Sequence, residues 1–137
     1  MELIGWKQKS QEGFRYYYEN NAFSIGSAQV LHYMLRILKP NKVIEVGSGF
    51  STAVMLDTNE KCLENKTEII AIEPYADRLR SVLTERDNLK LFECNLQEIP
   101  LSFFEQLEEG DTLFIDSSHV LRIDSDVNIP YSFLESL

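Results

Sequence analysis

The residues with the clearest chemical potential are an acidic residue and two glycines that lie close together. Residues 43–52 read VIEVGSGFST, with Glu45 two places before Gly47 and with Gly49 completing the turn. Glycine lets a ligand approach the backbone closely, and free N–H groups at a helix start hydrogen-bond carboxylates and phosphates. A strand, a glycine turn and a helix start in this order therefore predict a binding site for an anionic group.

Two different kinds of cofactor are bound by turns of this type, and the flanking residues decide between them. A dinucleotide-binding turn reads G-x-G-x-x-G, or has alanine in the last place. Here Thr52 occupies that place, and the ionisable Glu45 precedes the turn. Both features disfavour a nicotinamide dinucleotide and favour an E-x-G-x-G pattern.

Hydrophobic periodicity predicts strands that alternate with helices along the chain. The first helix is expected over residues 24–38, with Ser24 as its N-cap and Pro40 ending it. The expected strands are 42–46, 68–73, 89–94 and 112–115, and further helices are expected from about 51 and over 75–85 and 102–107. Apolar strands separated by helices predict a parallel sheet covered by helices on both faces. The predicted fold class is therefore α/β, with a Rossmann-like sheet.

Chemically useful residues end the expected strands. They are Gly47, Glu73, Asn95 and Asp116. In sheets of this kind, ligands bind outside the carboxyl ends of the strands. We therefore expect these residues to meet at one edge of the sheet.

The E-x-G-x-G pattern resembles motif I of the class I S-adenosylmethionine-dependent methyltransferases. The resemblance implies that Glu45 and the turn hold the methionine part of the cofactor. It implies that Glu73, which closes the second strand, binds both ribose hydroxyls through its two oxygens. Asn95 matches the segment beside the adenine, and replaces the acidic residue that is common there. The implied cofactor-binding residues are Glu45, Gly47, Ser48, Gly49, Ser51, Thr52, Glu73, Pro74, Asn95, Leu96 and Asp116.

The residues after the fourth strand narrow the resemblance. Residues 114–119 read FIDSSH, which is similar to F-I-D-x-x-H in methyltransferases of the macrocin O-methyltransferase-like type. Residues 125–127, SDV, fit the same subgroup. The resemblance covers roughly residues 22–137 and implies methyl transfer from S-adenosylmethionine to a small-molecule acceptor, with a hydroxyl as the accepting group.

The same resemblance makes Asp116 and His119 the candidate catalytic residues. An imidazole titrates near neutral pH, so His119 is the candidate general base, with Asp116 beside it. The alternative is that His119 supports its loop without touching the substrate. In related methyltransferases the acid at the position of Asp116 sometimes holds a divalent metal, but further oxygen ligands cannot be assigned here. We predict no metal site.

The chain of 137 residues is long enough for one domain. We expect an aromatic amino-terminal segment over residues 1–21, which either forms a lid over an acceptor pocket or packs on the sheet or the first helix. Residues 22–137 form the expected cofactor-binding domain. Class I methyltransferases have seven strands, so the domain is expected to be partial, truncated after its fourth strand. That strand would be an exposed edge at which a homodimer could form.

Composition excludes several classes of partner. The chain has 22 acidic and 13 basic residues, a formal charge of −9, which opposes binding to nucleic acid and to anionic membranes. Cys62 and Cys94 form neither a disulfide framework nor a metal-binding spacing. No apolar run approaches the length of a membrane span. We expect a soluble, cytoplasmic protein.

Two other functions remain open from the sequence. The first is a non-catalytic fragment or interaction module that binds S-adenosylmethionine and transfers no methyl group. The second is an NAD-dependent oxidoreductase, which Glu45 and Thr52 disfavour.

Overall fold

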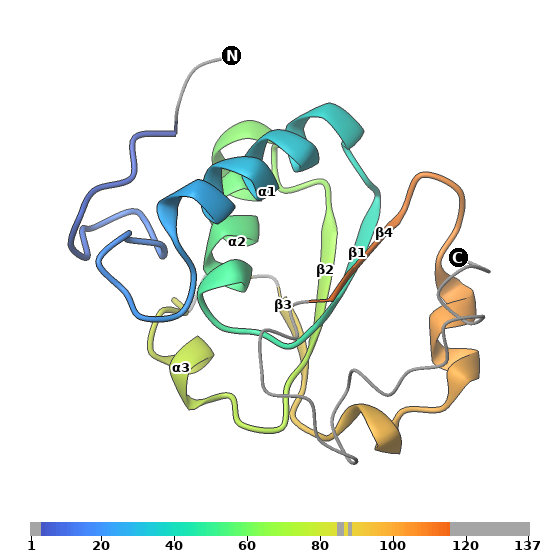
Figure 1. Cartoon of the computed structure of the whole chain (residues 1–137). Helices are drawn as coiled ribbons and strands as arrows, with labels where there is room; N and C mark the ends of the chain where they lie inside the picture. Colours follow the sequence, from blue (N-terminus) through green and yellow to red (C-terminus); the bar gives the residue numbers. More distant parts are fainter. Residues whose placement is uncertain (1–3, 85–86, 88, 116–137) are drawn as a thin grey trace.

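A parallel sheet of four strands forms the centre of the chain. The computed structural model describes residues 4–84, 87 and 89–115. The strands are β1 (Lys42–Val46), β2 (Glu68–Ile72), β3 (Leu89–Phe92) and β4 (Thr112–Ile115). Their order in the sheet is β3-β2-β1-β4, and every pair is parallel (Figure 1). This sheet confirms the predicted α/β fold class.

Helices cover both faces of the sheet, as predicted. Alternate residues of a strand point to opposite faces. Val43 and Ile69 accordingly pack with α1 (Ile25–Leu38) and α2 (Phe50–Cys62) on one face. On the other face, Ile44 packs with Phe104 of the 3-10 helix η2 (Leu101–Gln106), which follows the shorter 3-10 helix η1 (Leu96–Glu98). Figure 1 shows these two groups on opposite sides of the strands.

The first helix follows the prediction, whereas the third is much shorter than predicted. The Ser24 side chain accepts a hydrogen bond from the Ser27 N–H and caps α1 as expected. In contrast, α3 covers only Asp77–Arg80, where residues 75–85 were predicted to be helical. Asp87 accepts a hydrogen bond from the Thr84 N–H at 2.7 Å and pairs with the distant Arg15. A turn held by a tertiary ion pair thus replaces the last helical turns.

The strand order reverses direction at β1. From β1 the chain adds β2 and then β3 on one side, and it returns to place β4 on the other side of β1. Ligands of doubly wound sheets bind beside such a reversal, at the carboxyl ends of the strands. The carboxyl end of β1 is the place where Gly47 begins the turn. Among the described residues β4 pairs only with β1, and pairing of its open edge with a second copy stays a prediction.

The amino-terminal segment is anchored on α2 by one buried carboxylate. The Asp57 oxygens accept hydrogen bonds from Trp6 Nε1 at 2.8 Å, from the Arg15 N–H at 2.9 Å and from the Tyr16 N–H at 3.0 Å. The Arg15 guanidinium pairs with Asp57 at 3.1 Å and also contacts Glu60 at 2.9 Å. Tyr16 is fully buried in the cluster formed by α1 and α2. The segment therefore packs on these helices, which was one of the two expectations for its aromatic residues.

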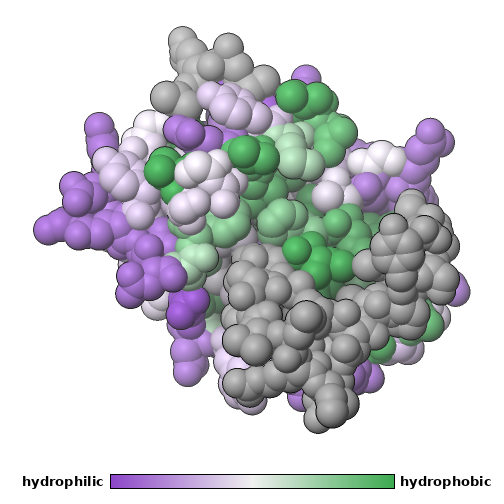
Figure 2. All heavy atoms as spheres, in the orientation of Figure 1, coloured by the Kyte–Doolittle hydropathy of each residue, from purple (hydrophilic) through white to green (hydrophobic). Residues whose placement is uncertain are grey.

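The outer side of α1 stays apolar. The exposed residues Val30, Met34, Ile37 and Leu38 follow one another at helical spacing, and Ile37 is 70% exposed. Figure 2 shows hydrophobic atoms gathered over this helix. None of the described helices has the length and apolar character needed to cross a membrane.

Replacement of Asp57 by asparagine should destabilise the fold. The change removes one of the three carboxylates that pair with the buried Arg15 guanidinium, and it replaces an oxygen that accepts hydrogen bonds with an NH₂ group that cannot. Leaving buried donors without an acceptor costs about 1 to 3 kcal/mol. Urea unfolding followed by far-UV circular dichroism measures the free energy of unfolding. Glu64→Gln, which breaks an exposed ion pair with Lys66, is the control and should leave the unfolding curve unchanged. An Asp57→Asn protein that unfolds at the wild-type urea concentration would contradict the anchoring role.

Candidate functional site

The turn between β1 and α2 has a backbone that favours glycine. Gly47 has φ 84° and Gly49 has φ 149°, both in the region that side chains rarely adopt. The Gly47 N–H donates to the Ile72 carbonyl at 2.9 Å, which ties the turn to the end of β2. The turn is therefore held in place by the neighbouring strand, and neither of its two glycines carries a side chain.

Glu45 supports this turn from below. Its carboxylate is fully buried in β1 and accepts short hydrogen bonds from the Ser51 and Thr52 hydroxyls. The Thr52 hydroxyl also accepts the Gly49 N–H at 3.2 Å. Ser51 and Thr52 are themselves almost fully buried, and their hydroxyls are engaged with Glu45. Their expected part in cofactor binding stays a prediction.

Glu73 lies directly beside the turn. Its Oε2 accepts a hydrogen bond from the Ser48 N–H at 2.9 Å, and its Oε1 accepts the Tyr75 N–H at 3.1 Å. A carboxylate offers about four lone-pair positions, so positions remain for two further donors such as hydroxyls. Glu73 is 8% exposed, so it lies largely buried at the carboxyl end of β2. The structure thus brings together two predicted site segments that are 25 residues apart.

The Ser48 hydroxyl in this turn is unsatisfied. Its Oγ is buried and has no hydrogen-bond partner among the described residues. A buried polar atom without a partner costs about 1 to 3 kcal/mol and calls for an explanation. This hydroxyl belongs to the residue whose N–H donates to Glu73.

Arg78 is a neighbour of the turn that sequence reasoning missed. Arg78 is exposed. Its aliphatic stem nevertheless lies over Gly49, since a Cβ added to Gly49 would come 3.4 Å from Arg78 Cδ. No spacing in the sequence signals this contact, because it depends on how α3 packs against α2. A cationic side chain thus stands beside the predicted anion-binding turn.

The remaining predicted residues lie further from the turn or outside the described part. Pro74 follows Glu73 directly. Asn95 is exposed and is the N-cap of η1. Leu96 is partly buried and packs against the cluster that contains Phe104, on the face of the sheet opposite α1 and α2. No described contact joins Asn95 to Glu73.

The two catalytic candidates, Asp116 and His119, lie outside the described residues, as do residues 125–127. Within residues 4–84, 87 and 89–115, no three acidic, histidine or cysteine side chains come close enough to hold a metal ion. Asp116 lies outside these residues, so the prediction of no metal site stays untested.

Comparisons with known proteins agree with the α/β fold described above. No model of a protein family matches the chain. An uncharacterized protein of Archaeoglobus fulgidus is 40% identical over 97 residues, which are 69% of this chain and 43% of the relative. A solved structure described as "cmcI-D160 Mg-SAM" superposes with a TM-score of 0.51 and 22% identity, over 69% of this chain and 42% of that chain. The likeness shows that the chain has the Rossmann-like α/β fold found in methyltransferases.

A second solved structure, from Plasmodium falciparum in complex with S-adenosyl-L-homocysteine, gives a TM-score of 0.48 and 17% identity over 71% of this chain and 52% of that chain. That overlap is too slight to support an inference. This chain spans less than half the length of both the archaeal relative and the first structure.

Thr52→Val should loosen the turn. The change keeps the shape of the side chain but removes one hydrogen bond to the buried Glu45 carboxylate and the acceptor for the Gly49 N–H. Leaving such groups unsatisfied costs about 1 to 3 kcal/mol, which urea unfolding will measure.

Thr112→Val is the matched control, since it makes the same change in β4 at a hydroxyl that has no partner among the described residues. It should leave the free energy of unfolding within about 0.5 kcal/mol of the wild type. Equal effects of the two changes would argue against the supporting role of Thr52.

Proposed function

We propose that this chain binds S-adenosylmethionine at the β1–α2 turn and is the cofactor-binding part of a methyltransferase. The observation that carries the proposal is the hydrogen bond between the Ser48 N–H and Glu73. This bond places the predicted anion-binding turn beside Glu73 at the end of β2. S-adenosylmethionine has an amino-acid end and a ribose, so a site that binds it needs these two groups close together. The fold shared with the S-adenosylmethionine-containing structure "cmcI-D160 Mg-SAM" supports the same reading.

Each part of the cofactor has a group that suits it. The methionine carboxylate fits the N–H groups at the start of α2, which lack partners within the helix, and Arg78 beside Gly49 adds a positive charge there. The two ribose hydroxyls fit the open lone-pair positions of Glu73. The unpaired Ser48 hydroxyl supplies a further contact in the turn. Asn95 and Leu96 are assigned to the adenine.

The proposed reaction is methyl transfer to a hydroxyl of a small-molecule acceptor, in the manner of the macrocin O-methyltransferase-like enzymes. S-adenosylmethionine supplies a methyl group that its sulfonium has already activated. In this proposal the described residues hold and orient the cofactor. Holding the methyl donor close to the accepting hydroxyl raises the rate of transfer. His119, assisted by Asp116, is assigned the removal of the proton from the accepting hydroxyl.

Glu73→Gln should weaken binding of S-adenosylmethionine about 10- to 100-fold. The change removes the charge from hydrogen bonds that are each worth about 1.5 to 3 kcal/mol, and 1.4 kcal/mol corresponds to a factor of ten. Isothermal titration calorimetry with S-adenosylmethionine and S-adenosylhomocysteine measures both affinities. NAD is the control ligand and should give no heat of binding.

Glu68→Gln is the matched control protein. Glu68 begins the same strand that Glu73 follows, but its partners are Lys42 and Lys90 at the opposite edge of the sheet. This variant should bind within about twofold of the wild type, since its interactions are exposed ion pairs. Absence of binding by the wild-type chain, with its folded state shown by circular dichroism, would refute the proposal for this chain, and equal loss in both variants would refute the role of Glu73.

His119→Ala should lower the rate of methyl transfer by about 10²- to 10⁴-fold, the usual contribution of a general base. The assay follows transfer of a labelled methyl group from S-adenosylmethionine to a panel of sugars. Affinity for S-adenosylmethionine should stay unchanged. Unchanged turnover with unchanged affinity would remove the base role. Binding without transfer in the wild type would favour the non-catalytic module instead.

A further inference from the structure

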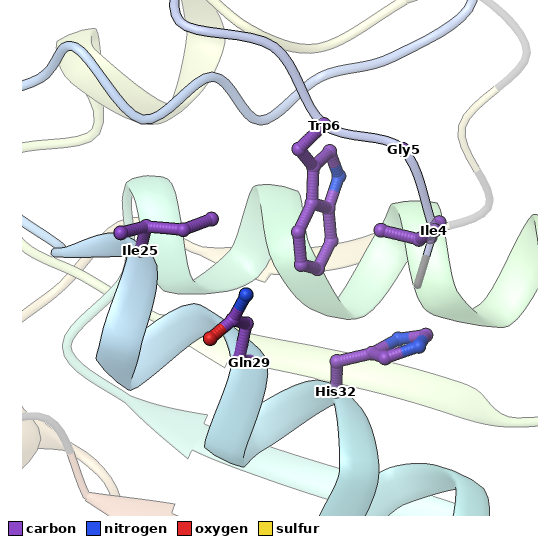
Figure 3. A pocket seen from close by; sticks show the side chains of 6 residues that line it. All are labelled: Ile4, Gly5, Trp6, Ile25, Gln29 and His32. Carbon is purple, nitrogen blue, oxygen red and sulfur yellow. The ribbon is translucent and has the colours of Figure 1, made fainter. Parts of the chain in front are cut away.

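Helix α1 has two covered sides and one exposed side. Ala28 and Leu35 are buried in the core that α1 forms with α2. His32 faces the amino-terminal segment, where the ring centroids of Trp6 and His32 are 5.4 Å apart (Figure 3). The exposed side, which we call the α1 stripe, consists of Gly26, Ser27, Val30, Met34, Ile37 and Leu38. At 3.6 residues per turn these six positions lie within about a third of the helix circumference.

The α1 stripe lacks the charged side chains that usually cover the solvent-facing side of a helix. None of its six residues is charged. Four of them carry large apolar side chains that are 48 to 70% exposed. A contiguous exposed apolar surface of this kind marks a site of contact with another molecule.

The charge of the chain indicates what can cover this surface. The chain has 22 acidic residues and a formal charge of −9, yet none of these acids lies between Glu19 and Glu45, the stretch that contains α1. Two copies of an acidic chain repel each other least where acidic residues are absent. The α1 stripe also offers a charged partner no group to pair with, so an apolar partner of equal character fits it best.

The exposed positions of the α1 stripe are symmetric along the helix. Positions 26, 27 and 30 mirror positions 38, 37 and 34 about position 32. In an interface with two-fold symmetry, residue i contacts residue j of the second copy, and j contacts i. When two copies of α1 lie antiparallel and cross at position 32, every exposed position of the stripe therefore meets an exposed position.

The same pairing matches small side chains with larger ones, as closely packed helices require. A Cβ added to Gly26 would meet nothing closer than the Ser24 Oγ at 3.9 Å, so the space above Gly26 is open to a side chain of another molecule. The three pairs between copies are Gly26 with Leu38, Ser27 with Ile37 and Val30 with Met34.

We propose that the α1 stripe is a dimer interface, in which α1 packs antiparallel against α1 of a second copy of this chain. The antiparallel direction separates the two Lys39 side chains by about 21 Å along the helix axis, at 1.5 Å per residue. This exceeds the Debye length of about 8 Å at physiological salt, so their repulsion is screened. The interface does not depend on the proposed cofactor site, since none of its residues belongs to the turn or to the end of β2.

The contact is one helix wide, which places it at the low end of specific interfaces, below about 1,200 Å². We therefore expect a dissociation constant in the micromolar range. Sedimentation velocity of the full chain, from micromolar to millimolar concentration, should show a reversible equilibrium between monomer and dimer.

Ile37→Glu should leave the chain monomeric at every concentration, because it places a carboxylate inside the apolar contact. Ile37 is 70% exposed, so the far-UV circular dichroism spectrum should match that of the wild type. Leu101→Glu is the matched control. It makes the same kind of change at an apolar side chain that is 56% exposed in η2, on the other face of the sheet, and should dimerise as the wild type does.

The pair of Gly26 and Leu38 tests the register. Gly26→Leu favours the helix but fills the space opposite Leu38, so it should weaken the dimer about tenfold or more. Adding Leu38→Ala exchanges the two sizes and should restore most of the lost affinity. A monomer at every concentration, tighter association of Gly26→Leu, or no recovery in the double variant would overturn the proposal. A dimer that persists in Ile37→Glu would also overturn it and would place the contact elsewhere, such as the open edge of β4.

Discussion

The buried carboxylate of Glu45 is the constraint on which the candidate site depends. A carboxylate inside a sheet is strongly unfavourable unless donors surround it. The Ser51 and Thr52 hydroxyls provide these donors, and both belong to the first turn of α2. The chain can bring them back over the strand end only through a tight turn, and positive φ at Gly47 and Gly49 makes that turn possible. Strand, turn and helix start are thus fixed relative to one another by one group.

Helix α2 joins this site to the outer layer of the molecule. Its first turn contacts Glu45, and Asp57 and Thr58 lie one to two turns further along the same helix. Asp57 collects the backbone and side-chain donors of the amino-terminal segment, and Thr58 orients His32. The same helix therefore anchors both the amino-terminal segment and the imidazole of His32. Loss of the Asp57 anchor would be expected to open this layer without changing the turn.

Most of the architecture could be predicted because it rests on local patterns. Short, mainly apolar runs of four or five residues mark the strands, and the capping serine marks the start of α1. The length of α3 could not be predicted, since the ion pair between Arg15 and Asp87 joins residues that are 72 positions apart. Tertiary contacts of this kind override helix periodicity, and no window of the sequence contains both partners.

The sequence by itself determined the α/β order of elements, the glycine turn and the acidic ends of the strands, because hydrophobic periodicity and glycine conformation act over a few residues. Only the tertiary structure decided that Glu73 contacts Ser48, that Arg78 lies over Gly49 and that Ser51 and Thr52 serve Glu45. It alone also decided that His32 keeps a buried, unpaired nitrogen. These features depend on distances between separate elements. Strand order and helix packing set those distances, and the spacing of residues along the chain does not reveal them.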